Sequence, residues 1–259
     1  MLNGPLAPHD LAVAFGAMLF SPMMGSFLQA AADRLSTDDS VLGARSHCDH
    51  CGRTIAPGDL VPILSWLLLR GRSRCCGRPL GTRLIAAEIA VPLLTAWALL
   101  AVPAPLWPVT VALGWALAGL VLADLASFRL PDIGTLGLTI AGLGLALAGM
   151  TGAPLDHALG AAAGYALMRA IALGYRAWRG REGLGHGDAK LMAAAGAWLG
   201  WQALPSVLLV ASLAGLVLAL VLARATAGGR LHATLALPFG PPLALGFWCA
   251  WLYGPLVLG

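Results

Sequence analysis

The chain has 259 residues, of which 59% are hydrophobic and 11% charged, and its mean hydropathy is +0.80. This balance excludes a soluble globular domain and is typical of a polytopic membrane protein. The net charge of +4 is concentrated between the apolar stretches, so it indicates membrane topology and gives no reason to expect a nucleic-acid partner. No Lys or Arg precedes the first apolar stretch, so we expect a retained span rather than a signal peptide.

Eight apolar stretches occur along the chain, and most approach the ~20 residues needed to cross the hydrocarbon core of a bilayer. They are 11–31, 84–102, 108–126, 132–150, 157–175, 189–201, 205–223 and 235–257. The sequence therefore predicts an all-α polytopic membrane protein with eight transmembrane helices. The predicted parts are a first transmembrane helix at 1–31, a small cytoplasmic cysteine-containing domain at 32–83 and a seven-helix membrane core at 84–259.

The positive charges predict how these helices are oriented. If the N-terminus is outside, all 16 Lys and Arg residues lie in the inner loops or at the adjoining helix ends, the loops being 32–83, 124–131, 176–188 and 224–234. Cytoplasmic loops of membrane proteins are enriched in Lys and Arg. We therefore expect both termini in the periplasm and the 32–83 domain in the cytoplasm.

Four cysteines lie in the 32–83 domain, namely Cys48, Cys51, Cys75 and Cys76. The cytoplasm is reducing, so the cluster favours a zinc site over disulfides. Adjacent cysteines are sterically awkward as joint ligands, so His47 or His50 could complete the tetrahedron in place of one of them. The alternative is a loop domain that contains only reduced thiols. A fifth cysteine, Cys249, is interpreted as ordinary helix packing.

Four carboxylates lie at the cytoplasmic ends of predicted spans: Glu88, Asp124, Asp132 and Asp188. Asp132 and Asp188 open their helices, where a carboxylate caps free N–H groups, and this capping accounts for Asp132. Asp124 ends its helix, where the dipole disfavours negative charge, and recessed acids in membranes are usually functional. For Glu88 two interpretations stay open, an ion pair with Arg83 or another inner-face cation and a role in the site.

Helix rise ranks the depth of these acids. Counted from Trp201 as outer anchor, Asp188 lies ~20 Å into a core of ~30 Å, and Asp124 lies ~25 Å from Trp107. Two recessed aspartates on different helices predict a dyad that shares a proton, as in aspartyl proteases. Gly185 and Gly187 would leave room for a peptide backbone beside Asp188.

Other features concern helix structure. His186 is expected to be an exposed loop residue rather than a base. The pairs Gly160/Gly164 and Gly196/Gly200 predict close helix packing. The proline-rich stretch 237–242 cannot form a regular helix, so it is either a kink or late helix start, or an unwound stretch that lines a cavity.

Five motifs occur in the chain. One is Gly185-His186-Gly187-Asp188-Ala189-Lys190-Leu191, followed by Gly196-Ala197-Trp198-Leu199-Gly200-Trp201, and another is Asp124-Leu125 with Leu130-Pro131-Asp132. The others are Gly25-Ser26-Phe27-Leu28 with Arg34-Leu35, Pro62-Ile63-Leu64-Ser65-Trp66 with Gly71, and Pro238-Phe239-Gly240-Pro241. Together they closely resemble the type IV prepilin peptidases, inner-membrane aspartyl proteases of the GxGD kind, whose second and first aspartate motifs the first two match. The resemblance covers essentially the whole chain.

The resemblance implies that Asp124 and Asp188 are the catalytic pair, facing the cytoplasm of a multi-pass bacterial inner-membrane protein. It implies cleavage of the basic leader of type IV prepilins or type II secretion pseudopilins, followed by N-methylation with S-adenosylmethionine. The expected partners are these precursors and membrane lipids. The supporting residues are expected to be Gly185, Gly187, Lys190, Glu88, Pro238, Phe239, Gly240 and Pro241. The family pattern has two CxxC pairs, and Ser73 stands here where the second pair would open, so Cys75 could replace it after a small shift.

Three alternatives remain. One is a GxGD protease without methyltransferase activity, closer to preflagellin or signal peptide peptidases, although the Pro-Phe-Gly-Pro motif and the cysteines argue against it. The second is a small proton-coupled transporter that uses the same acids, for which we expect acids at mid-membrane and internal repeats; the sequence has neither. The third is a non-enzymatic membrane anchor for 32–83, which leaves the recessed acids unexplained.

Overall fold

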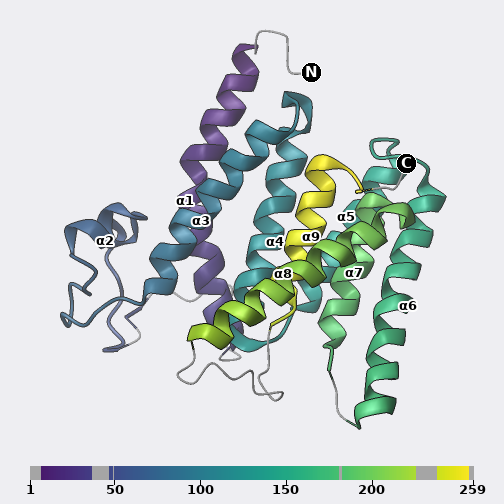
Figure 1. The fold of residues 1–259 in the computed structure, drawn as a ribbon. Coiled ribbons are helices and arrows are strands. Elements are labelled where there is room, and N and C mark those ends of the chain that lie inside the picture. The colour runs from purple at the N-terminus through teal and green to yellow at the C-terminus, as the bar shows by residue number, and fades with distance from the viewer. Residues whose placement is uncertain (1–6, 37–46, 49, 181–182, 226–237, 257–259) are drawn as a thin grey trace. The chain divides into compact units, whose positions relative to one another are not determined.

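The computed structural model describes residues 7–36, 47–48, 50–180, 183–225 and 238–256, and it is helical throughout apart from turns and two isolated bridges (Figure 1). The α-helices are α1 Pro8–Ser36, α2 Leu64–Leu68, α3 Thr82–Ala101, α4 Trp107–Ser127, α5 Asp132–Leu147, α6 Pro154–Arg179, α7 His186–Leu199, α8 Leu204–Ala225 and α9 Gly240–Tyr253. Short 3-10 helices lie at Pro57–Leu60, Ala104–Leu106 and Trp201–Ala203. The chain divides into a first unit, Met1–Ser127, and a second unit, Phe128–Gly259.

Each of the eight predicted apolar stretches contains a helix, but not all of these helices are long enough to cross a bilayer. Five candidate spans occur in the described residues: Pro8–Leu35, Thr82–Ala101, Ala104–Ser127, Pro154–Arg179 and Trp201–Arg224. Helix α5 has 16 residues, and α7 and α9 have 14 each. The protein is therefore a multi-pass membrane protein, and eight full spans remain a prediction.

The start of α9 bears on the two interpretations of the proline-rich stretch. Helix α9 begins at Gly240, with Phe239 as its N-cap and Pro241 in its first turn. A proline is tolerated in the first turn because its missing N–H would have no helical partner there. The helix thus starts late, at residue 240, while an unwound stretch that lines a cavity stays a prediction. Residues 235–237, which the prediction placed in the last span, lie outside the described residues.

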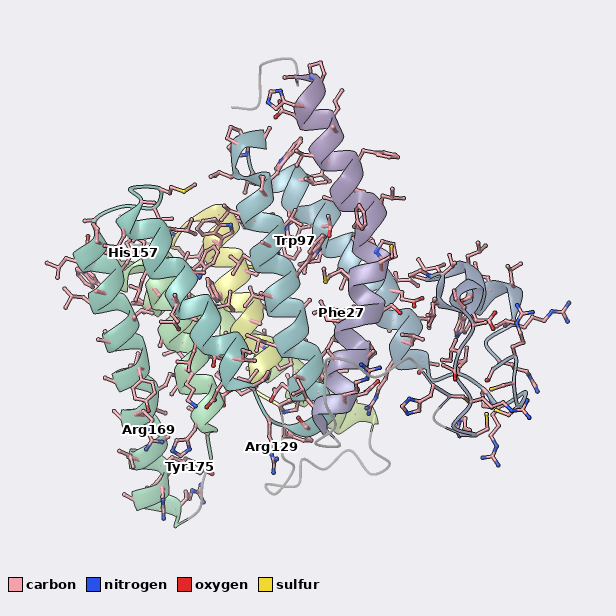
Figure 2. All side chains as sticks on the ribbon, turned by 180° about the vertical axis from the view of Figure 1, so that it is seen from behind. Phe27, Trp97, Arg129, His157, Arg169 and Tyr175 are labelled. Carbon is pink, nitrogen blue, oxygen red and sulfur yellow. The ribbon has the colours of Figure 1, made fainter. Side chains whose placement is uncertain are left out.

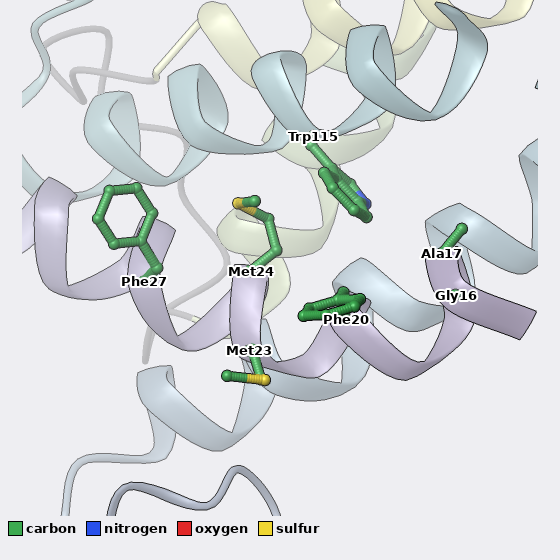
Figure 3. A pocket seen from close by; sticks show the side chains of 7 residues that line it. All are labelled: Gly16, Ala17, Phe20, Met23, Met24, Phe27 and Trp115. Atoms are coloured by element: carbon green, nitrogen blue, oxygen red, sulfur yellow. The ribbon is translucent and has the colours of Figure 1, made fainter. Parts of the chain in front are cut away.

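In the first unit, α1 packs on α3 and α4. A Cβ added at Gly25 of α1 would lie 2.5 Å from the carbonyl oxygen of Ala87 on α3, so only glycine permits this crossing. Trp115 of α4 donates through Nε1 to Thr95 Oγ1 on α3 at 2.9 Å. Figure 3 shows an apolar pocket of about 450 Å³ between α1 and α4, lined by Gly16, Ala17, Phe20, Met23, Met24, Phe27 and Trp115.

In the second unit, α7 packs against α5, α6 and α9, and most of its residues are buried. Glycines let α6 and α7 touch through their backbones, as predicted: a Cβ at Gly196 would lie 2.1 Å from the Gly160 carbonyl oxygen, and one at Gly164 would lie 2.5 Å from that of Met192. The indole of Trp198 fastens α7 to α5 by donating to the Leu138 carbonyl oxygen at 2.7 Å. Helix α7, which begins with the second-aspartate motif, is therefore held on several sides.

Candidate functional site

Asp188 lies in the first turn of α7 and is buried, with 7% of its surface exposed. Its Oδ2 accepts a hydrogen bond from the backbone N–H of Gly185, the N-cap residue, at 3.1 Å. The carboxylate thus satisfies one of the free donors of the helix N-terminus, where negative charge is favoured. The expected cap is present, and it places a buried carboxylate in the glycine-rich turn.

The glycine at 187 has a packing role that the sequence did not indicate. A Cβ added there would lie 2.7 Å from Cβ of Leu130, which precedes α5. The space that the sequence interpretation left for a peptide backbone is filled at this position by Leu130. At Gly185 an added Cβ would lie 3.3 Å from Oδ2 of Asp188 itself, so a side chain there would crowd the carboxylate.

Asp124 lies in the last turn of α4, three residues before the helix ends at Ser127, and 5% of its surface is exposed. The negative end of the helix dipole disfavours a carboxylate at this place, so helix stability does not explain the residue. Asp124 belongs to the first unit and Asp188 to the second. Both predicted catalytic acids are buried, and their meeting remains a prediction.

Asp132 does not cap its helix as expected. Pro131 is the N-cap of α5, and the Asp132 side chain makes no capping hydrogen bond. Instead, Asp132 Oδ1 accepts a hydrogen bond from Nζ of Lys190 on α7 at 2.5 Å. Lys190 was expected to support the site, but its partner, 58 positions away, was missed because nothing in the local sequence links the two.

Basic side chains also lie at this end of the second unit. His186 is exposed, as predicted, but it is the first residue of α7 rather than a loop residue, and its Nε2 lies 3.0 Å from Nη1 of Arg169 on α6. Figure 2 shows Arg129, Arg169 and Tyr175 toward one end of the second unit and His157 toward the other end of α6.

Glu88 of α3 is buried, with 4% of its surface exposed, and it accepts a hydrogen bond from the backbone N–H of Ile63 at 2.7 Å. Ile63 directly precedes α2 and has a φ of 62°, a strained value for a β-branched residue. Glu88 therefore links the cysteine-containing segment to a membrane helix. The sequence left two interpretations of Glu88 open, an ion pair with a cation and a role in the site. The contact favours a structural role, in which the partner is a backbone N–H instead of a cation.

Two similar turns carry the cysteine cluster. In one, the N–H of Cys48 donates to the Arg53 carbonyl and the N–H of Gly52 to the Cys48 carbonyl, both at 2.8 Å. In the other, Ser73 makes the same two bonds, with Arg78 and Gly77, also at 2.8 Å. Ser73 thus occupies the place of Cys48 in the second turn, and Cys76 occupies that of Cys51.

Cys75 supplies the fourth sulfur. The Sγ atoms of the four cysteines lie within 4.8 Å of one another, with 3.2 Å between Cys51 and Cys75 and 3.7 Å between Cys48 and Cys76. Four thiolates at the usual Zn–S length of ~2.3 Å around a tetrahedral zinc ion are ~3.8 Å apart, so the cluster fits this metal. The sulfurs of the adjacent Cys75 and Cys76 both lie in the cluster, although such a pair was expected to be sterically awkward, and the four cysteines offer four ligand atoms without a histidine.

The thiols of the cluster have different acidities. The hydrogen bond with Ser73, together with backbone N–H groups, lowers the pKa of Cys48 to about 5. A backbone hydrogen bond at Arg53 favours the Cys51 thiolate, but the hydrogen bond with Cys75, burial and the charge of Cys48 outweigh it and raise the pKa of Cys51 to about 11. The serine that breaks the cysteine pattern is thus in contact with two of the sulfurs, at 3.5 Å from Cys48 and 3.0 Å from Cys75.

Comparisons with known proteins agree with this arrangement. The pattern of the bacterial peptidase A24 N-terminal domain matches residues 19–102, and that of the type IV leader peptidase family matches residues 111–220. Proteins named prepilin leader peptidase/N-methyltransferase are similar over most of the chain. The one from Aeromonas hydrophila is 38% identical over 91% of this chain and 89% of its own length. The one from Burkholderia pseudomallei strain 1026b is 38% identical over 94% and 87%. The one from Pectobacterium carotovorum is 42% identical over 78% and 71%. No solved structure matches the chain. The two patterns follow each other along the chain, and the second contains both buried aspartates. With relatives this similar over most of its length, the chain belongs to the type IV leader peptidase family.

Proposed function

We propose that the protein is an intramembrane aspartic endopeptidase that removes the leader from type IV prepilins or type II secretion pseudopilins and then N-methylates the new N-terminus. The observation that carries this proposal is the buried Asp188 in its glycine-rich turn, in a chain whose relatives are named prepilin leader peptidase/N-methyltransferase. Family membership argues against the transporter and anchor alternatives.

In the proposed mechanism, Asp124 and Asp188 act as a dyad that holds one proton. The ionised aspartate takes a proton from a water molecule, whose oxygen attacks the carbonyl carbon of the scissile peptide bond. The protonated aspartate gives its proton to the leaving amine as the C–N bond breaks. If it protonates the carbonyl oxygen instead, the other aspartate passes the proton taken from water to the amine, and a hydroxyl of the tetrahedral intermediate returns a proton to the first aspartate. Burial of both acids supports this assignment, because a dry site strengthens the electrostatic interactions on which such proton transfers depend.

The other proposed site residues have physical roles around these acids. Gly185, Gly187 and Lys190 hold the first turn of α7 through the contacts described above. Glu88 joins the cysteine-containing segment to α3. The residues Pro238, Phe239, Gly240 and Pro241 start α9, which packs on α7.

We infer that the site faces the cytoplasm, that both termini lie in the periplasm and that the cysteine-containing domain is cytoplasmic. Arg129 and Arg169 lie toward one end of the second unit, and His157 marks the opposite end (Figure 2). Lys and Arg are enriched on the cytoplasmic side of membrane proteins, which supports a cytoplasmic position for the end with the two arginines. The short helices α5, α7 and α9 would complete eight crossings if the bilayer is thin around them.

Methylation requires S-adenosylmethionine as the methyl donor, by analogy with the relatives. The apolar pocket between α1 and α4 does not fit this cofactor, because the one polar side-chain group of its lining, the indole N–H of Trp115, already donates to Thr95 and leaves nothing for the carboxylate or the adenine (Figure 3). We therefore assign the cofactor to no residues of this chain.

The direct test is mass spectrometry of a prepilin co-expressed with the protein. We expect the precursor to lose its leader and the new N-terminal residue to gain the mass of one methyl group. A precursor that keeps its leader in the presence of folded protein contradicts the proposed function. Cleavage without methylation would support the protease-only alternative.

We also propose that Cys48, Cys51, Cys75 and Cys76 bind zinc, with Cys75 in place of the cysteine that Ser73 replaces. The four sulfurs lie within 4.8 Å of one another, and four cysteines are a usual ligand set of structural zinc. Such a site would stabilise the small domain, which has few buried apolar side chains among its described residues.

For this site we predict that Cys75→Ser lowers bound zinc from about one ion per chain to less than about a tenth, since three cysteines hold a structural zinc poorly. The double variant Cys75→Ser/Ser73→Cys should recover the zinc, because Ser73 occupies in its turn the place that Cys48 has in the first. The measurement is the zinc content of the purified protein by elemental mass spectrometry. Cys249→Ser in α9 serves as the control and should keep full zinc. Normal zinc in Cys75→Ser would show that Cys75 is not a ligand.

A further inference from the structure

The starts of α5 and α7 are joined at two points, although they lie almost 60 positions apart in the sequence. One is the ion pair between Lys190 Nζ and Asp132 Oδ1, at 2.5 Å. The other is the contact of Gly187 with Leu130, where an added Cβ would come within 2.7 Å of the leucine Cβ. The segment before and at the start of α5 thus forms a support for the first turn of α7, which carries Asp188.

The geometry of a helix says how this support acts on Asp188. Residues two apart on a helix point in different directions, so Lys190 does not face Asp188. Asp188 is buried, whereas the Lys190 side chain is 28% exposed and reaches toward α5. Lys190 therefore holds the turn from another side and fixes its rotation about the helix axis. A small rotation of this turn would move the Asp188 carboxylate directly.

The ion pair between Lys190 and Asp132 contributes little to the stability of the fold. The Asp132 side chain is 64% exposed, and exposed ion pairs contribute little to folding. The turn already has its own cap through Gly185, and α7 is fastened to α5 further along by Trp198. What the pair adds is a fixed position for the end of the helix where the catalytic carboxylate lies.

We propose that Asp132 and Lys190 are a positioning pair that sets the orientation of Asp188 for proton transfer. This inference rests on the proposed function, in which Asp188 is one of the two catalytic acids. Neither residue touches the reacting atoms in this proposal. Their effect should therefore appear in kcat, because misplacing a catalytic group by about 1 Å can cost about 100-fold in rate.

The test compares Lys190→Gln, Asp132→Asn and the exchange Lys190→Asp/Asp132→Lys in the full-length protein, with cleavage of a prepilin measured in detergent. Each single variant should lower kcat by about 10- to 100-fold with KM within about threefold, and the exchange should recover at least about tenfold. The unfolding midpoint should shift by no more than about 4 °C in the single variants. Asp156→Ala is the matched control: it removes the hydrogen bond from Trp201 Nε1 at the opposite end of α7, and it should leave kcat unchanged.

Single variants that keep more than half of the wild-type kcat would overturn the positioning role. So would a large fall in the unfolding midpoint with proportionate loss of folded protein and unchanged kcat per folded molecule, because it marks a purely structural pair. If the exchanged protein does not fold, Lys190→Arg replaces it and should keep the rate within about fivefold. The wild type and Asp188→Asn are assayed in parallel. An inactive wild type contradicts the proposed function, whereas an active wild type with active single variants contradicts only the positioning pair.

Discussion

Asp188→Asn is expected to abolish leader cleavage, with a fall of at least about 10³-fold, while the protein accumulates normally in the membrane. Asparagine has nearly the same shape, and its side-chain oxygen can still accept the N–H of Gly185 that caps α7. It cannot take a proton from water or carry one to the leaving amine. The substitution therefore removes the chemistry and leaves the helix start in place.

Asp124→Asn in α4 should also abolish leader cleavage, because asparagine cannot accept or donate the proton that the reaction transfers. A dyad requires both acids, so the two single variants and the double variant should be equally inactive. The assay is cleavage of a co-expressed prepilin, with abundance of each variant measured on the same membranes. Asp156→Asn is the matched control, because its remaining oxygen can still accept the N–H of Trp201 and it should cleave normally.

More than about a tenth of the wild-type rate in either single variant would refute the dyad. A variant that fails to accumulate is compared by its rate per folded molecule. The double variant adds a separate check. If the two aspartates contributed independently, their losses in rate would multiply in the double variant. If they share one proton, the double variant should lose no more rate than either single variant.

The positions of the helices could be predicted from the sequence because apolar runs of the required length have few other structures available in a membrane. The number of full crossings could not, because it depends on where helices end. Helix α7 ends at Leu199, before Gly200 with its φ of 80°. Helix α9 begins only at Gly240, so that Pro241 lies in its first turn. Such ends depend on local backbone geometry rather than on average hydrophobicity.

The candidate site, like the fold, could be predicted only in part from the sequence. The burial of Asp124 and Asp188 follows from their places at recessed helix ends. The Lys190–Asp132 pair does not, because it joins segments whose proximity is created by the packing of α5 on α7. The partner of Glu88 was equally inaccessible, since a backbone N–H carries no sequence signature.

The cysteine cluster shows a signal that the sequence did contain. Cys48 and Gly52 recur as Ser73 and Gly77 at the same spacing, and both glycines have the left-handed φ of about 70° that the turn requires. Comparing the two segments in this way identifies Ser73 as the counterpart of Cys48 from the residues themselves, whereas the prediction did so only through the family resemblance. The choice of Cys75 over a histidine could not be deduced from the sequence, because it depends on how the two turns face each other.

Gly196→Val is expected to prevent folding of the second unit, with at least about 3 kcal/mol lost and folded protein reduced by about tenfold or more. The reason is the contact between α6 and α7: any Cβ at this position would lie 2.1 Å from the carbonyl oxygen of Gly160. Backbone atoms cannot turn aside as a flexible side chain can, so the two helices must separate. Separation would also break the contact of His157 Nδ1 with the Ala197 carbonyl oxygen at 3.0 Å.

The measurement is the yield of monodisperse protein in detergent together with its unfolding midpoint. Gly174→Ala in α6 is the matched control, because nothing lies within 4 Å of an added Cβ there. Alanine is favoured over glycine inside a helix by about 0.5–1 kcal/mol, so this variant should unfold at the wild-type midpoint or slightly above it. Gly196→Val protein with normal yield and midpoint would mean that α6 and α7 do not meet through their glycines. Since α7 carries Asp188, any Gly196→Val protein that does fold should also cleave poorly.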